Sequence, residues 1–195
     1  PLVFFDRVAP SIPADQVITN DMEAARLVTR HLIEQGRKRI AHFAAPQNLA
    51  IGRERKEGYL KALEEAGIPY DPALCAEADT FEKGYIEVTR MCKAGCLPDA
   101  FFGANDLTAI GAIKALTEAG FNVPGDVSVA GFSDSRFAEI SQPTLTSVDQ
   151  HGFEMGALAT RMLLNRIRQE GSELPFETSV LNADLVVRNS SVPHR

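Results

Sequence analysis

Short apolar runs alternate along most of the chain with stretches of helical periodicity. Four runs have the length and composition of buried strands: residues 2–5, 40–44, 100–104 and 127–132, with a weaker one at 75–78. Four stretches carry apolar side chains three and four positions apart, as one face of a helix does: residues 21–35, 53–66, 82–94 and 106–119. This alternation predicts βαβ units and a parallel sheet.

Glycines mark the ends of several predicted helices, because a residue after the last helical turn often takes a left-handed conformation. Gly36, Gly67 and Gly120 occupy such positions. Further along, residues 145–148 predict a short crossing segment, and a long helix is expected from about 153 to 168, ending near Gly171. Residues 178–187 predict a strand that is antiparallel or at a sheet edge. The middle strands predict one doubly wound lobe, to which the two chain ends do not belong.

Composition sets the broad class of the protein. The 195 residues suit one domain or two small lobes, and 45% apolar with 24% charged residues is ordinary for a soluble globular protein. No apolar run approaches the roughly 20 residues of a membrane helix, so no membrane partner is expected. The net charge of −6 argues against a surface that grips nucleic acid, because such surfaces carry a basic excess. An apolar strand directly after Pro1 is what a fragment of a longer protein would show.

The cysteines predict neither a metal site nor a disulfide. Cys92 and Cys96 are four residues apart and would share one face of a helix. Two thiols do not complete a tetrahedral metal site, and no histidine stands at ligand spacing. These two and Cys75 are therefore expected to be free thiols, and no metal or cofactor is expected.

Enzyme motifs are incomplete. Residues 131–135 begin like a nucleophile elbow after a strand, but its closing glycine is missing, and the triad histidine would have to be His151 or His194. Neither common glycine-rich phosphate loop occurs. We expect no catalytic residue. An enzyme on a similar α/β sheet is the rival class, and turnover of a bound ligand would reveal it.

Polar side chains follow the predicted strands, where open parallel sheets bind their ligands. The candidate contacts are Asp6, Arg7, Arg55, Phe81, Asn105, Asp106, Ser133 and Gln150. Carboxylate, amide and guanidinium groups can each engage neighbouring hydroxyls, and aromatic rings cover the apolar face of a sugar or a base. A set rich in orienting groups and poor in reactive ones predicts a binding site for a small polar molecule.

Each candidate has a structural alternative. Asp106 either caps the helix that it begins or contributes to the site, while Asn105 before it is expected to face the cleft. Arg55 lies near a helix start, which is unfavourable for a cation and favours ligand binding over a surface role. Asp6 is either a contact or a turn former, and Phe81 is either a stacking platform or part of the core.

Several segments together resemble the effector-binding region of lac repressor family regulators: PLVFFDR at 1–7, FGANDLTAIG at 102–111, VPGDVSVAGFSD at 123–134 and LVVRNS at 185–190. The resemblance covers essentially the whole chain. It implies a periplasmic-binding-protein-like α/β fold with doubly wound parallel sheets in two lobes. Residues 20–149 plus 179–195 would form the C-terminal effector-binding lobe, and 1–19 plus 150–178 would be part of an incomplete N-terminal lobe.

The same resemblance implies the ligand-sensing domain of a cytoplasmic bacterial transcriptional regulator. A small polar effector, a sugar or related metabolite, would bind in an interlobe cleft of a homodimer that holds operator DNA through an upstream helix-turn-helix headpiece. By position, Asp6, Arg55, Asn105 and Gln150 match effector contacts of the family, whereas Ser133 replaces an aspartate of many sugar-binding members. The alternative with the same fold is a periplasmic sugar-binding protein for transport or chemotaxis.

Overall fold

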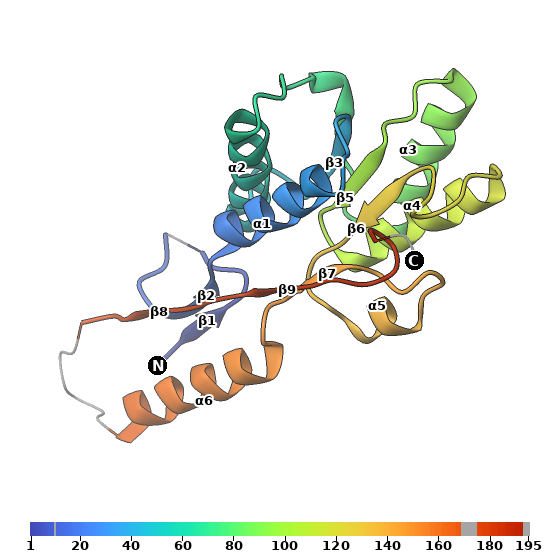
Figure 1. The fold of residues 1–195 in the computed structure, drawn as a ribbon. Helices are drawn as coiled ribbons and strands as arrows, with labels where there is room; N and C mark the ends of the chain where they lie inside the picture. Colours follow the sequence, from blue (N-terminus) through green and yellow to red (C-terminus); the bar gives the residue numbers. More distant parts are fainter. Residues whose placement is uncertain (10, 169–174, 193–195) are drawn as a thin grey trace. The chain divides into compact units, whose positions relative to one another are not determined.

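Figure 1 shows the computed structural model, which describes residues 1–9, 11–168 and 175–192. The chain forms two compact units, one of residues 1–20 and 150–183 and one of residues 21–149 and 184–195. We call them the smaller and the larger unit. The chain passes from one unit to the other three times, and each unit has its own sheet and its own covering helices.

The larger unit contains a four-stranded parallel sheet in the order β4-β3-β5-β6. Its strands are β3 (Ile40–Ala44), β4 (Cys75–Glu77), β5 (Ala100–Gly103) and β6 (Ser128–Ala130). Helices α1 (Asp21–Glu34) and α2 (Ala50–Glu65) pack against each other, as do α3 (Phe81–Ala94) and α4 (Asp106–Glu118). The two helix pairs cover opposite faces of the sheet (Figure 1). The predicted parallel, doubly wound α/β fold is therefore confirmed.

Burial on both faces explains why β3 and β5 are nearly continuous apolar runs rather than alternating ones. Phe43 and Phe101 belong to the apolar cluster under α3 and α4. On the other face, the His42 ring stacks between Phe102 and Tyr59 of α2, with ring centroids 4.7 and 5.2 Å away. The Tyr59 hydroxyl donates to the Ile40 carbonyl at 2.8 Å, which ties α2 to the sheet.

The last segment of the chain joins the larger unit through buried hydroxyl groups. Ser190 Oγ donates to the Val129 carbonyl at 2.6 Å and accepts from the Thr146 backbone N–H at 2.8 Å. Ser191 Oγ lies 2.7 Å from His31 Nε2. The short elements of this unit are η1 (Pro72–Leu74), α5 (Arg136–Ile140), and β7 (Ser147–Asp149) paired antiparallel with β9 (Asp184–Val186).

The smaller unit is a three-stranded parallel sheet in the order β1-β2-β8, with helix α6 packed on it. Met155 and Ala159 of α6 pack against Val17 of β2. Arg166 near the helix end forms an ion pair with the buried Asp15 at 2.6 Å. The elements are β1 (Val3–Phe5), β2 (Asp15–Thr19), α6 (Gly152–Arg168) and β8 (Thr178–Leu181).

The structure differs from the sequence-based predictions in four respects. The strand predicted at 178–187 is two strands, because β8 pairs parallel with β2 whereas β9 pairs antiparallel with β7. The contacts consequently place residues 179–183 in the smaller unit, where the prediction had them with the larger one. Strand β2 was missed, and α2 begins at Ala50, three residues before its predicted start. The predicted helix end near Gly171 lies outside the described residues.

Candidate ligand-binding site

A pocket of about 180 Å³ lies at the carboxyl ends of β5 and β6 in the larger unit. It is lined by the residues that follow these two strands: Asn105, Asp106, Leu107, Phe132, Ser133 and Ser135. The structure thus brings together three of the predicted contacts, Asn105, Asp106 and Ser133, although the last two are 27 residues apart in sequence. Parallel strands explain this, because their carboxyl ends meet at one edge of the sheet.

Asn105 caps α4, so the alternative that Asp106 caps this helix is wrong. The extended backbone of Asn105 lets its Oδ1 accept from the Thr108 N–H at 2.9 Å and from the Thr108 hydroxyl at 3.1 Å. Its Nδ2 donates to the Asp79 carbonyl at 2.7 Å. Asn105 therefore joins the loops after β4 and β5 while lining the pocket.

Asp106 is a buried carboxylate that fixes the loop after β6. Its Oδ1 accepts from the Ser147 hydroxyl at 2.5 Å and its Oδ2 from the Ser135 N–H at 2.6 Å. Burial raises the pKa of Asp106, and the hydrogen bonds from Ser147 and Ser135 oppose that rise. A Cβ at Gly131 would come within 2.6 Å of Oδ1, so this close approach requires glycine.

The loop after β6 has an unusual backbone. Ser133 and Asp134 have φ angles of 101° and 43°, which residues other than glycine rarely adopt. Their N–H groups donate to the Val148 carbonyl at 2.9 Å and the Ser147 hydroxyl at 3.1 Å. Strain of this kind persists only where the surroundings hold it, and it is common at ligand sites. Ser133 remains exposed at the pocket.

Arg55 contacts the wall of the pocket from within the protein. Its Nε donates to Asp21 Oδ1 at 2.5 Å and its Nη1 to the Ala104 carbonyl at 2.7 Å. Its Cζ lies 3.7 Å from the ring centroid of Phe132, a cation–π contact. The guanidinium thus supports the Phe132 ring that lines the pocket, and a direct effector contact by Arg55 stays a prediction.

Phe81 lies at the contact between two helices. It is the first residue of α3, which is capped by the Thr80 hydroxyl, and it is half-buried. A Cβ at Gly111 of α4 would come within 2.1 Å of the Phe81 carbonyl oxygen, so the helices approach closely here. The role of Phe81 as a stacking platform stays a prediction.

The smaller unit holds the other three candidates. Gln150 is buried, and its Nε2 donates to Thr19 Oγ1 at 3.2 Å and to Asp6 Oδ1 at 3.4 Å. Asp6 has a φ of 58°, and its N–H donates to the Val17 carbonyl at 3.1 Å. Arg7 is exposed. The structure therefore brings Asp6 and Gln150 together at the end of β1, across 144 residues of sequence.

Two residues that shape the pocket loop were not predicted. Ser147 bonds both Asp106 and Asp134, and Arg188 forms an ion pair with Asp134 at 2.5 Å. Arg188 stands 54 residues after its partner, so no spacing in the sequence relates the two. Its position in the run LVVRNS, which carries the family resemblance, was the one available signal.

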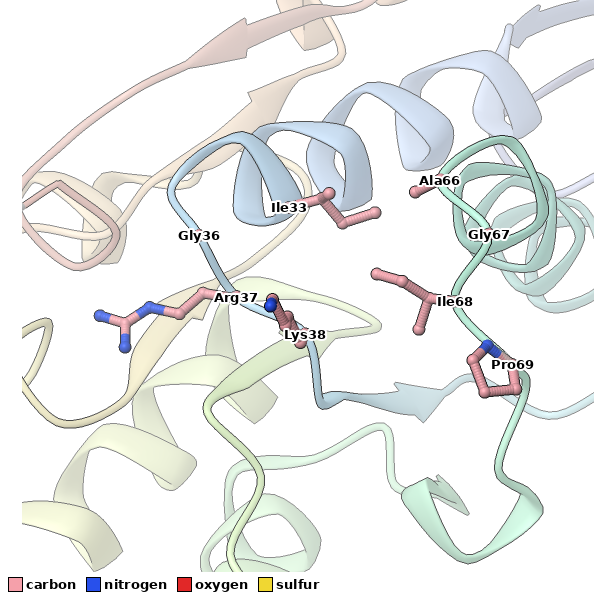
Figure 2. Close-up of a pocket in the computed structure, with 8 residues that line it drawn as sticks. All are labelled: Ile33, Gly36, Arg37, Lys38, Ala66, Gly67, Ile68 and Pro69. Carbon is pink, nitrogen blue, oxygen red and sulfur yellow. The ribbon is translucent and has the colours of Figure 1, made fainter.

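A larger pocket, of about 390 Å³, lies at the carboxyl-terminal ends of α1 and α2. Ile33 and Ile68 point toward each other across it, and the Arg37 side chain points away (Figure 2). The Arg37 Nε donates to Ser128 Oγ at 3.0 Å instead. The walls of this larger pocket are mostly aliphatic, and none of the contacts predicted from the sequence lines it.

Within the described residues, no group of three or more histidine, cysteine, aspartate or glutamate residues is placed to hold a metal ion. None of the helices that the structure describes has both the length and the apolar character needed to span a membrane.

Comparisons with known proteins add independent information. The profile of the family described as periplasmic binding protein-like domain matches residues 29–191. The HTH-type transcriptional repressor PurR of Actinobacillus pleuropneumoniae serotype 3 is 33% identical over 191 residues, which cover 97% of this chain and 57% of the relative. The HTH-type transcriptional regulator CelR of Thermobifida fusca is 38% identical over 183 residues, or 92% of this chain and 53% of the relative. The chain thus spans a little over half the length of these relatives.

Solved structures agree with the sequence comparison. A complex of the transcriptional regulator CelR with cellobiose has a TM-score of 0.88 at 36% identity, covering 97% of this chain and 58% of the other. A LacI family regulator from Enterococcus faecium with bound ribose also has a TM-score of 0.88, at 28% identity, covering 100% and 72%. A putative LacI family regulator from Sanguibacter keddieii has a TM-score of 0.91 at 33% identity, covering 98% and 73%.

Proposed function

We propose that the chain senses a small polar effector for a transcriptional regulator. It belongs to the family of periplasmic binding protein-like domains, in the form found in lac repressor family regulators. The effector class that we propose is a neutral sugar or a related metabolite. The relatives and structural neighbours are transcriptional regulators, which favours this role over that of a periplasmic transport protein.

The observation that carries the proposal is the pocket at the ends of β5 and β6. Its lining combines the exposed Ser133 with the buried ring of Phe132 and with Asn105, whose amide is bonded to Thr108 and to the Asp79 carbonyl. The carboxylate at its edge, Asp106, is hydrogen-bonded within the protein, so the pocket suits a ligand with hydroxyl groups better than a cation. Two structural neighbours contain the neutral sugars cellobiose and ribose.

The size of the pocket limits what it holds. A volume of 180 Å³ is below the roughly 300–1,000 Å³ of sites that enclose a drug-sized ligand. We infer that it accommodates one sugar ring or a group of similar size. Asp6 and Gln150, which lie together in the smaller unit, are proposed as further effector contacts, and Arg55 as a contact or a support of Phe132.

The remaining parts of the function concern the whole regulator. We propose that it acts in the cytoplasm as a homodimer, binds operator DNA through a helix-turn-helix headpiece, and does no chemistry on its effector. The names of the relatives, HTH-type regulators, support the DNA-binding role. Effector and operator would then be linked: if the effector changes DNA affinity by some factor, DNA changes effector affinity by the same factor.

Calorimetric titration of the chain with cellobiose, D-ribose and a nucleobase tests the proposal, using Leu107→Trp as the blocking variant. Leu107 lines the pocket from the exposed first turn of α4, so a larger ring there fills the pocket without entering the core. We expect one of the sugars to bind and Leu107→Trp to lose at least about tenfold in affinity. Ile86→Trp, at an exposed position on α3, should bind like the unmodified chain.

Three results would contradict the proposal. They are the absence of binding by every compound, unchanged affinity in a folded Leu107→Trp variant, and turnover of the bound ligand.

A further inference from the structure

Arg188 and Asp134 form a two-pronged ion pair beside the pocket loop. Arg188 Nη1 lies 2.5 Å from Asp134 Oδ1, and Nη2 lies 3.1 Å from Oδ2. Nη1 also donates to the Leu145 carbonyl at 2.8 Å. The side chains are only 16% and 13% exposed. Paired N–H···O bonds of this kind fix the direction of both side chains as well as their distance.

The backbone of Arg188 is itself held in place. Its N–H donates to Thr146 Oγ1 at 2.8 Å, and that hydroxyl lies 2.6 Å from Ser191 Oγ. Thr146 and Ser191 are fully buried. Two residues before Arg188, Val186 of β9 pairs with Ser147 of β7. Arg188 therefore reaches the loop from a rigid base.

The loop after β6, which the Arg188 side chain contacts, has a strained backbone. Ser133 and Asp134 both have positive φ angles, and Ser133 is exposed at the pocket. The Ser133 N–H donates to the Val148 carbonyl and the Asp134 N–H to the Ser147 hydroxyl, whereas in the described part of the chain only Arg188 holds the Asp134 side chain. A residue at positive φ returns easily to an ordinary conformation when its restraints are removed.

The negative charges near the pocket loop also favour a guanidinium beside Asp134. The nearby charge of Asp134 contributes to the raised pKa of the buried Asp106, whose oxygens hold Ser135 and Ser147. Hydrogen bonding to Asp134 raises the pKa of Arg188. Without the guanidinium, the charge of Asp134 would no longer be balanced near the buried Asp106, which favours opening of the loop to water.

We propose that Arg188 is a positioning residue of the ligand pocket: through Asp134 it holds Ser133 in the strained conformation that places it at the pocket. Arg188 does not line the pocket itself. The inference rests on the proposed function for its ligand part and on the loop geometry for its positioning part, and these two parts are tested separately.

Backbone amide exchange of the ligand-free chain tests the positioning part, with Arg188→Met compared to Arg166→Met. Arg166 makes a matched ion pair with Asp15 in the smaller unit, with both distances 2.6 Å. We expect exchange of the Ser133, Asp134 and Ser135 amides to rise at least about tenfold in Arg188→Met and to stay unchanged in Arg166→Met. Arg188→Lys keeps the positive charge but cannot form both hydrogen bonds to Asp134 as a guanidinium does, so its exchange rates should lie between those of Arg188→Met and the unmodified chain.

The double variant Arg188→Met with Asp134→Asn separates positioning from general stability. If the pair is what holds the loop, adding Asp134→Asn should not raise exchange further. Unchanged exchange at residues 133–135, or a rise that is equal throughout the larger unit, would overturn the positioning role.

Titration with cellobiose and D-ribose tests the ligand part. If the unmodified chain binds one of them, Arg188→Met should weaken that binding at least about tenfold, while Arg166→Met should not. Equal affinity in Arg188→Met would overturn the ligand part. If the unmodified chain binds neither sugar, the proposed sugar-sensing function fails together with the ligand part, whereas the exchange result still decides whether Arg188 holds the loop.

Discussion

Arg55 and Asp21 form a buried ion pair, with 2.5 Å between Nε and Oδ1 and side chains only 5% and 4% exposed. Asp21 begins α1, and Arg55 lies in the second turn of α2. The same guanidinium reaches the Ala104 carbonyl after β5 and the Phe132 ring after β6. One side chain thereby connects both helices of one layer to the two strand ends that form the pocket.

Substitution of Arg55 should therefore destabilise the larger unit as well as affect ligand binding. Arg55→Met leaves Asp21 as a buried carboxylate without its guanidinium, and loss of one partner of a buried pair costs about 3–5 kcal/mol. Adding Asp21→Asn should recover part of that loss, because the buried negative charge that Arg55 balances is removed as well. Urea unfolding of the two variants measures both effects.

The matched control is Arg30→Met. Arg30 pairs with Glu34 at 3.6 Å on the exposed side of α1, and such surface pairs contribute at most about 1 kcal/mol. An Arg55→Met variant as stable as Arg30→Met would show that the buried pair does not support the fold.

The sequence predicted the strands that are buried on both faces and missed the one whose burial depends on a distant charge. Residues 40–44 and 100–104 are apolar except for His42, so their pattern alone identifies them. Strand β2 has only two apolar residues and begins with Asp15, whose charge is balanced by Arg166, 151 residues later. No local pattern contains that pairing.

The sequence predicts which residues of the candidate site lie at the strand ends, because chain order determines those positions. It does not predict which side chains bond to one another there, because that depends on side-chain geometry. Asn105 and Ser133 follow strands, so topology alone places them at one sheet edge. Asn105 and Asp106 are both good helix caps, and only the extended backbone at Asn105 decides between them. The partners Arg188 and Asp134 are brought together by the return of the chain after β8, which no spacing reveals.

Asn105→Ala should destabilise the larger unit by about 1–2 kcal/mol, because it removes the cap of α4. It also removes the hydrogen bond to the Asp79 carbonyl. Asn105→Asp keeps the cap acceptor and loses the donor to Asp79, so we expect it to recover most of the loss. Thermal unfolding compares the two variants. If Asn105→Ala matched Asn105→Asp in stability, the capping role would be refuted.

Two glycine-to-alanine substitutions should change the free energy of unfolding in opposite directions. Gly131→Ala places a Cβ 2.6 Å from Asp106 Oδ1 and 2.8 Å from Leu145 Cδ2, and overpacking of this kind costs roughly 1–3 kcal/mol. Gly156→Ala in α6 meets no atom within 4 Å and should stabilise by about 0.5–1 kcal/mol, because alanine is the better helix former. Chemical unfolding of both variants provides the test, and a neutral Gly131→Ala would show that Asp106 does not need this close approach.

The buried His42 should make stability depend on pH. Burial lowers its pKa to about 4, although its Nδ1 is bonded to the Phe102 carbonyl. In the unfolded chain a histidine has a pKa of about 6.5, so between pH 6.5 and 4 the unfolded state binds a proton that the folded state does not. Stability therefore falls as the pH drops through this window, by up to roughly 3 kcal/mol for this group. Burial lowers the pKa of His31 as well, which adds to the loss in the same direction.

His42→Phe separates the two histidines. Phenylalanine keeps a ring between Phe102 and Tyr59 but has no titrating nitrogen. Among the described residues, His42 Nε2 has no hydrogen-bond partner, so the substitution breaks no bond at that atom. The free energy of unfolding, measured by urea at several pH values between 4.5 and 6, should lose up to about 1.4 kcal/mol per pH unit from its slope in His42→Phe. Part of the slope should remain because His31 still titrates. A slope equal to that of the unmodified chain would mean that His42 binds its proton in the folded state as readily as in the unfolded one.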